Sequence, residues 1–169
     1  MKSTPAIVYI SLIFILFSCE NENGSQNLPE LSVNLVHHSP CKGSKSTYQI
    51  ADIPSSQSCL EYSYDAANKV LRLKHINAGF NCCPDSLYCH VAFNQDTIII
   101  SEFEESALCN CDCLFDLEFE VSGVEMQPCQ LKLIEPYASD QDKIVFGINL
   151  IIDQEGTFCV FRTQYPWNI

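Results

Sequence analysis

Basic residues are scarce in this chain of 169 residues. Nine Lys and Arg stand against 21 Asp and Glu, which gives a formal net charge of -12. Nucleic acids and anionic membrane surfaces are bound through basic patches, so this composition argues against charge-driven binding to either. We interpret the acidic excess as a solubilising surface charge, with calcium or a cationic partner as the alternative.

Motifs of several enzyme classes are also missing. The chain has no glycine-rich phosphate-binding loop, no Cys-x-x-Cys redox motif and no serine in a recognisable nucleophile context. We therefore predict a protein without catalytic activity. A hydrolase built from two carboxylates stays as a third interpretation, because such a pair is assembled in space and leaves no spacing signal.

The N-terminal residues have the pattern of an export signal. Lys2 precedes an apolar run from Ala6 to Phe17. This run has the length of a signal-peptide core and is shorter than the roughly 20 residues that span a bilayer. It ends in Leu-Phe-Ser-Cys at 16–19, which resembles the bacterial lipobox, whose cysteine is acylated and becomes the mature N-terminus. We expect residues 1–18 to be a signal peptide and Cys19 to carry the lipid that anchors the protein in a membrane.

Residues 19–30 form a polar stretch that predicts a flexible tether. Glu20 and Glu22 resemble the surface-export signals of Bacteroidota lipoproteins. We therefore expect an outer-membrane lipoprotein that is either exposed on the cell surface or faces the periplasm.

The rest of the chain, residues 31–169, predicts an all-β domain of about nine strands. Short alternating or β-branched runs, separated by turn residues, lie at 31–37 and 47–50 (both weak), 60–64, 70–76, 88–93, 97–103, 111–121, 129–135, 144–152 and 157–162. The last eight runs predict four successive hairpins. Two half-buried sheets must cover each other, so we expect a single β-sandwich of immunoglobulin-like or Greek-key type, with a barrel as the alternative.

The segment 109–122 gives the clearest strand signal. Seven apolar residues or cysteines share one face at a period of two: Cys109, Cys111, Cys113, Phe115, Leu117, Phe119 and Val121. The residues between them are mostly polar or acidic, which predicts a half-buried strand. Side chains two residues apart on an extended strand are parallel and their Cα atoms lie about 6.6 Å apart, so the three cysteines of this ladder should not bridge one another.

Eleven cysteines are too many for a reducing compartment unless metal occupies them. If Cys19 carries the lipid, ten cysteines remain. An even number of cysteines in an exported domain favours a full set of disulfides, which here would be five. The ten are Cys41, Cys59, Cys82, Cys83, Cys89, Cys109, Cys111, Cys113, Cys129 and Cys159. We expect the three ladder cysteines to pair with those at 82, 83 and 89. The other four would form two bridges, for instance Cys129 with Cys159.

A metal-binding envelope protein is the alternative, with zinc or iron as its ion. Zinc holds four ligands with Zn–S distances of about 2.3 Å, so ligand sulfurs lie under about 4 Å apart. Three thiols along one strand converge that closely only if the strand bends. The candidate metal ligands are Cys82, Cys83, Cys111, His75 and His90. Under the disulfide interpretation we expect no cofactor.

Two short motifs indicate surface modification. Asp85-Ser86-Leu87 and Asp96-Thr97-Ile98 resemble the Asp-Ser/Thr-apolar acceptor of Bacteroidota O-glycosylation, with Ser86 and Thr97 as acceptors on predicted turns.

Phe-Asn-Cys-Cys-Pro at 80–84, followed by Cys-x-Cys-x-Cys-Leu-Phe-Asp at 109–116, resembles a family of small, functionally uncharacterised, cysteine-rich Bacteroidota lipoproteins. The resemblance covers about residues 71–133. It implies a shared fold and cellular address, and it assigns no catalytic or binding residues. The sequence thus predicts a non-enzymatic accessory or binding module of the cell envelope, whose partner is an envelope protein or glycan that the sequence does not identify.

Overall fold

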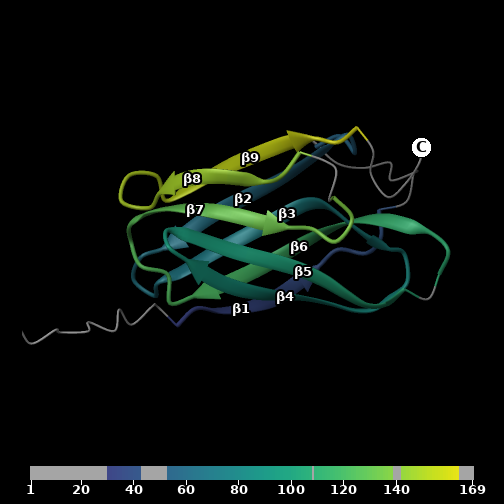
Figure 1. The fold of residues 1–169 in the computed structure, drawn as a ribbon, viewed down its shortest axis with the longest axis horizontal. Helices are drawn as coiled ribbons and strands as arrows, with labels where there is room; N and C mark the ends of the chain where they lie inside the picture. The colour runs from purple at the N-terminus through teal and green to yellow at the C-terminus, as the bar shows by residue number, and fades with distance from the viewer. Residues whose placement is uncertain (1–29, 43–52, 108, 139–141, 164–169) are drawn as a thin grey trace, which may run out of the picture.

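The computed structural model describes residues 30–42, 53–107, 109–138 and 142–163 (Figure 1). The predictions for the signal peptide, for Cys19 and its tether, and for a strand at 47–50 fall outside these residues. The described residues contain nine strands: β1 (Ser32–His38), β2 (Gln57–Asp65), β3 (Val70–Asn81), β4 (Pro84–Asn94), β5 (Thr97–Ala107), β6 (Asp112–Ser122), β7 (Pro128–Ile134), β8 (Val145–Asn149) and β9 (Glu155–Phe161). No helix long and apolar enough to cross a membrane occurs within the described residues.

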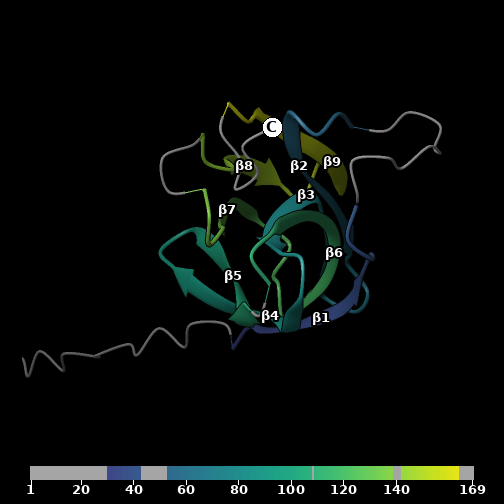
Figure 2. The ribbon, with the colours of Figure 1, turned by 90° about the vertical axis from the view of Figure 1, so that its right-hand side faces the viewer.

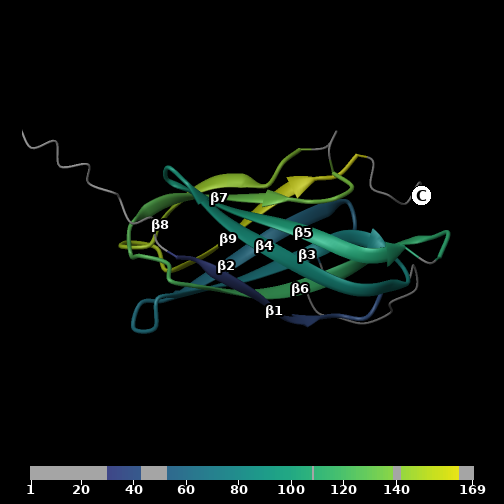
Figure 3. The same ribbon diagram turned by 60° about the horizontal axis from the view of Figure 1, so that its bottom comes forward.

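The strands form two sheets, which confirms the predicted β-sandwich. One sheet has the order β1-β6-β3-β2-β9 and the other has the order β4-β5-β7-β8. Viewed along the strands in Figure 2, the five-stranded sheet curves around one side of the molecule and the four-stranded sheet closes the other. All described pairings are antiparallel except that of β5 with β7, which is parallel. Figure 3 shows that β4 also runs beside β1, where the two sheets approach each other along one edge.

The core lies between the sheets because the strands alternate buried and exposed residues. Along β6, the face from Phe115 to Val121 is buried at every second residue, as the period of two predicts. The inward faces of β3, β5, β6 and β7 supply most of this core: Leu71, Leu73, Ile98, Ile100, Phe115, Leu117, Phe119, Val121, Leu131 and Leu133. These side chains are each removed almost entirely from water, which is the main favourable contribution to folding.

Two of the four predicted hairpins are confirmed and two are wrong. β2 and β3 pair directly across the turn at 66–69, and β4 and β5 pair across the turn at 95–96. By contrast, β6 and β7 belong to different sheets, and so do β8 and β9. The connecting segments cross between the sheets, and each sends an apolar side chain into the core, Val124 in the first and Leu150 in the second. Burying these side chains favours the crossing over a local turn.

Gly123 starts the first of these crossings. Its φ of +84° lies in the left-handed region, which favours glycine. A Cβ at this position would lie 2.7 Å from the carbonyl oxygen of Glu30, so the close approach of the chain before β1 also requires glycine.

Candidate functional site

Four cysteines meet where the chain crosses twice between the sheets at one end of the sandwich. Cys82 and Cys83 lie between β3 and β4, and Cys109 and Cys111 lie between β5 and β6. Disulfides join Cys82 to Cys111 and Cys83 to Cys109, each with a Cα–Cα distance of 5.6 Å. The pairing of β3 with β6 positions them, because its register ends at Asn81 opposite Asp112, next to the first of these bridges. We call these four residues the cysteine corner.

Hydrogen bonds hold the two segments of the corner together independently of sulfur. The Asn81 side chain donates from Nδ2 to the Cys109 carbonyl at 2.6 Å. Its Oδ1 accepts from the backbone N–H groups of Cys83 at 3.0 Å and of Cys109 at 3.4 Å. The backbone N–H of Cys82 donates to the Cys111 carbonyl at 3.0 Å. A buried asparagine that satisfies both of its functional groups in this way fixes the local backbone.

The predicted cysteine ladder is corrected in part. β6 begins at Asp112, so Cys109 and Cys111 precede the strand, and only Cys113 stands on it. The chain bends here because it is returning from the four-stranded sheet. Cys109 and Cys111 do bridge the 82–83 segment as expected. Cys113 instead pairs with Cys41, at a Cα–Cα distance of 5.6 Å, and Cys89 is not its partner.

The expected fifth disulfide is absent from the described residues, where Cys89 and Cys129 are free. The suggested pairing of Cys129 with Cys159 is wrong because the two lie on different sheets. Cys159 on β9 is directly opposite Cys59 on β2 and bridges it, with their Cα atoms 4.0 Å apart. Burial raises the thiol pKa of Cys89, which also lies near Glu102, to about 12, and burial raises that of Cys129 to about 11. Both thiols are therefore protonated and unreactive at neutral pH.

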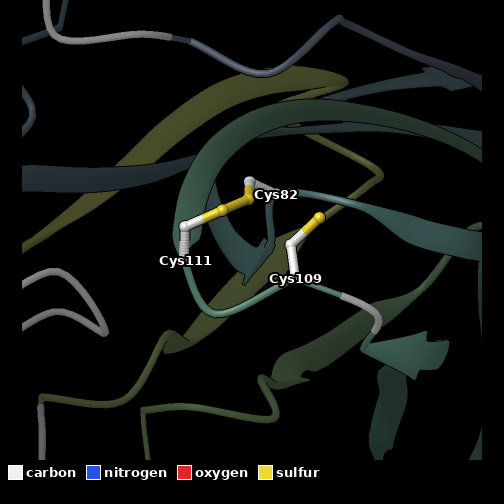
Figure 4. A group of neighbouring side chains, drawn as sticks. All are labelled: Cys82, Cys109 and Cys111. Carbon is white, nitrogen blue, oxygen red and sulfur yellow. A yellow bond between two sulfur atoms is a disulfide. The ribbon is translucent and has the colours of Figure 1, made fainter.

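The histidines expected for the metal alternative do not join the cysteine corner. Within the described part of the chain, the sulfur atoms of Cys82, Cys109 and Cys111 lie within 4.8 Å of one another (Figure 4). His75 is instead fully buried between the sheets. His90 lies on the outer face of β4, edge-on to the rings of Tyr88 and Phe103. A metal held at the corner would thus have sulfur ligands alone.

A second polar group, which the sequence analysis did not identify, is buried between the sheets. His75 on β3 is at its centre and is 0% exposed. Its Nε2 lies 2.7 Å from the Ser58 hydroxyl, and its Nδ1 lies 2.7 Å from a carboxylate oxygen of Glu102 on β5. Glu135 approaches the same ring at 3.5 Å and forms an ion pair with Arg162. We call these five residues the buried charge cluster.

The cluster contains two carboxylates, one guanidinium and one imidazole. Burial by itself would lower the pKa of His75, but the carboxylates of Glu102 and Glu135 outweigh this effect and raise it. Burial also raises the pKa of Glu102, and the nearby imidazole opposes that rise. With a protonated imidazole, two positive charges balance two negative charges across both sheets. Pairing of this kind offsets the large cost of removing charges from water.

Ser58, His75 and Glu102 are hydrogen bonded in the order of a Ser-His-acid triad, but they are enclosed. Ser58 is 0% exposed and Glu102 is 2% exposed, so no substrate reaches the hydroxyl in this structure. The serine hydroxyl of a catalytic triad attacks the carbonyl carbon of a substrate, so it has to be accessible to that substrate. The arrangement therefore acts as a polar link between the sheets. The sequence did carry a signal for it, because His75 continues the inward face of Leu71 and Leu73.

A hollow of about 290 Å³ lies on the outer face of the five-stranded sheet. Its floor carries Arg72 and Lys74 from β3 beside Glu118 and Glu120 from β6. Arg72 pairs with Glu120 at 3.1 Å and Lys74 pairs with Glu118 at 3.4 Å, all four being substantially exposed. These two carboxylates are thus neutralised by cations.

The two O-glycosylation candidates differ in their setting. Ser86 lies within β4, not on a turn as predicted, and its hydroxyl donates to Glu105 at 3.1 Å. Thr97 is the first residue of β5, directly after the turn, and its hydroxyl donates to Asp96 at 3.1 Å. Ser86 is exposed and Thr97 is partly exposed, so both residues lie at the surface.

Comparison with known proteins finds no matching family model, no matching curated protein and no matching solved structure.

Proposed function

We propose that this chain is a lipid-anchored, disulfide-stabilised β-sandwich of the bacterial cell envelope, which serves as a non-enzymatic accessory or binding module. The observation that carries the proposal is the set of four disulfides. Disulfides of this number form and persist in oxidising compartments such as the periplasm and the cell surface. The four disulfides therefore support export of the protein, and the N-terminal pattern supplies a signal for it.

The distribution of cysteines supports lipid attachment at Cys19. Eight of the eleven cysteines are in disulfides, and the free thiols of Cys89 and Cys129 are held protonated by burial. Cys19 is the cysteine that remains, and it stands at the acylation position of the lipobox-like segment. A partner, whether an envelope protein or a glycan, would meet the sandwich at the outer membrane, on the cell surface or on the periplasmic side.

Metabolic labelling tests this proposal. The full chain, with its leader, is expressed in a Bacteroidota host that is fed an alkyne-tagged fatty acid. We expect label on the wild type and on Cys89→Ala, a matched control that removes another cysteine outside the disulfides. Cys19→Ala should carry no label and should leave the membrane fraction. An unlabelled wild type, or equal labelling of the Cys19→Ala variant, would contradict lipidation at this residue.

Non-reducing peptide mapping of the same material tests the compartment. We expect four bridges, with Cys89 and Cys129 alkylated only after denaturation. A fully reduced chain isolated from the membrane would contradict export to an oxidising compartment. Protease treatment of intact cells then distinguishes a surface-exposed from a periplasm-facing sandwich, because only the former is cleaved before the outer membrane is opened.

A further inference from the structure

The sulfur atoms of the cysteine corner are arranged more compactly than two separate disulfides require. Beyond the two covalent bonds, the sulfurs of Cys82 and Cys83 lie 3.9 Å apart. Those of Cys82, Cys109 and Cys111 all lie within 4.8 Å of one another. The Cys83 sulfur is outside this group of three, but it is bonded to that of Cys109 and in contact with that of Cys82, so the four sulfurs are contiguous. Figure 4 shows the Cys109 side chain beside the Cys82–Cys111 bridge.

One of these distances matches the requirement of a tetrahedral thiolate site, and the three sulfurs within 4.8 Å of one another lie close to it. Four sulfurs at about 2.3 Å from a zinc ion lie about 3.8 Å from each other. The contact between Cys82 and Cys83 already has this length. After reduction, each bonded pair has to separate by about 2 Å, a movement that side-chain rotation can supply.

The corner also has contacts that do not involve sulfur. Asn81 ties the segment at 82–83 to the segment at 109–111 through the hydrogen bonds described above, and the pairing of β3 with β6 ends next to them. We expect these contacts to favour keeping the four thiols close together after reduction. Cys111 is exposed and the other three are partly exposed, so both a reductant and a metal ion can reach the sulfurs.

We propose that the cysteine corner is a redox-gated metal site, at which Cys82, Cys83, Cys109 and Cys111 hold one soft metal ion when their two disulfides are reduced. Ligands of this kind select zinc or copper(I) over the hard cations magnesium and calcium. The ligand set contains no histidine. This inference concerns the corner alone and does not rest on the lipid anchor.

The chemistry balances with a phosphine or a thiol as the reductant. Two phosphine molecules and two water molecules reduce the two bridges and leave as two phosphine oxides. Four thiol molecules reduce the two bridges to four cysteine thiols and leave as two disulfides of the reductant. One zinc ion then replaces the four thiol protons, forming four Zn–S bonds. Two molecules of a small-molecule disulfide reverse the sequence, because they are reduced to four thiols as the two bridges re-form, each sulfur that enters a bridge is lost as a ligand, and the ion is released.

Zinc titration of the reduced protein tests the proposal. The purified protein is treated anaerobically with a phosphine, zinc is added, and retained zinc is measured after gel filtration while alkylation and mass spectrometry identify the protected cysteines. We expect one zinc per chain and protection of the four corner cysteines. The double variant C82S/C111S should bind zinc more weakly by a factor on the order of one hundred or more, since even outer-shell changes cost about 10–100-fold.

A matched variant separates this site from general thiol binding. C41S/C113S removes another bridge with the same Cα–Cα distance of 5.6 Å but none of the proposed ligands, and it should bind zinc as the wild type does. If reduction unfolds the chain, zinc should restore the β-sheet circular dichroism of the wild type and of C41S/C113S but not of C82S/C111S. Equal zinc binding by both variants, or no zinc retained by the reduced wild type, would overturn the proposal. Loss of zinc binding with normal labelling of Cys19 would refute this inference alone.

Discussion

Neutralising Glu102 should destabilise the fold more than neutralising a surface glutamate does. Glutamine keeps the shape of Glu102 and the oxygen that lies 2.7 Å from Nδ1 of His75, so Glu102→Gln removes little besides the charge. With the imidazole protonated, the remaining cluster would then hold two positive charges against one negative charge. Removing one partner of a buried ion pair costs about 3–5 kcal/mol. A loss of this size lowers the melting temperature by roughly 6–20 °C in a protein of this length.

Glu118→Gln provides the control, because the same substitution is made at a pair that is about 40% exposed. Glu118 lies 3.4 Å from Lys74, with side-chain exposures of 42% and 41%. Exposed pairs contribute about 0.2–1 kcal/mol, so a change below about 1 kcal/mol is expected. Both variants are measured by urea denaturation under non-reducing conditions, with far-ultraviolet circular dichroism as the signal. If Glu102→Gln loses no more than Glu118→Gln, the charges of the buried cluster are not coupled as described.

Two further predictions concern pH and disulfides. The pKa of His75 is raised in the folded state, so the native protein keeps a proton that the unfolded chain gives up above about pH 6.5. The free energy of unfolding should therefore fall as pH rises beyond that value, by at most about 1.4 kcal/mol per pH unit. Urea denaturation from about pH 6 to 7.5, below the range in which the thiols of the unfolded chain ionise, measures the slope. His75→Gln should reduce this slope, and a stability that rises with pH would contradict the assignment. Removing the Cys59–Cys159 bridge, which spans 100 residues, should cost more than removing the Cys83–Cys109 bridge, which spans 26, because the Cys82–Cys111 bridge still closes nearly the same loop around the latter. Paired alanine variants compared by thermal denaturation test this order, and an equal or reversed order would refute it.

Local patterns in the sequence predicted the strands and the hairpins whose turns are local. Strand periodicity and turn residues were sufficient for β2–β3 and β4–β5, because both strands of each pair belong to one sheet. The same signals failed at the turn after Gly123, because they do not say which sheet the next strand joins. That choice depends on the burial of side chains such as Val124 between the two sheets.

The cysteine corner was partly predictable, and the buried charge cluster was missed. Cys82 and Cys83 precede one predicted hairpin, and Cys109 and Cys111 follow it, which indicated cross-links between the two segments. The bend before β6 could not be predicted, because it depends on the crossing between sheets and gives no periodic signal. His75 and Glu102 continue the inward faces of their strands, so they could have been flagged as buried. Their pairing could not, because it joins two sheets whose register is set only by tertiary packing.

The β4–β5 hairpin is bypassed by every disulfide of the described residues. Each bridge joins a cysteine before Pro84 to a cysteine after Ala107. A tension applied between β3 and β6 would therefore pass through the sulfur bonds and leave the hairpin unloaded. A protease cut within the turn at 95–96 would likewise leave a single covalent molecule. Covalently, the protein is therefore a cross-linked frame that excludes the hairpin with Tyr88, His90 and Phe103 on its outer face. The hairpin is held to that frame by packing and by the pairing of β5 with β7, and not by sulfur.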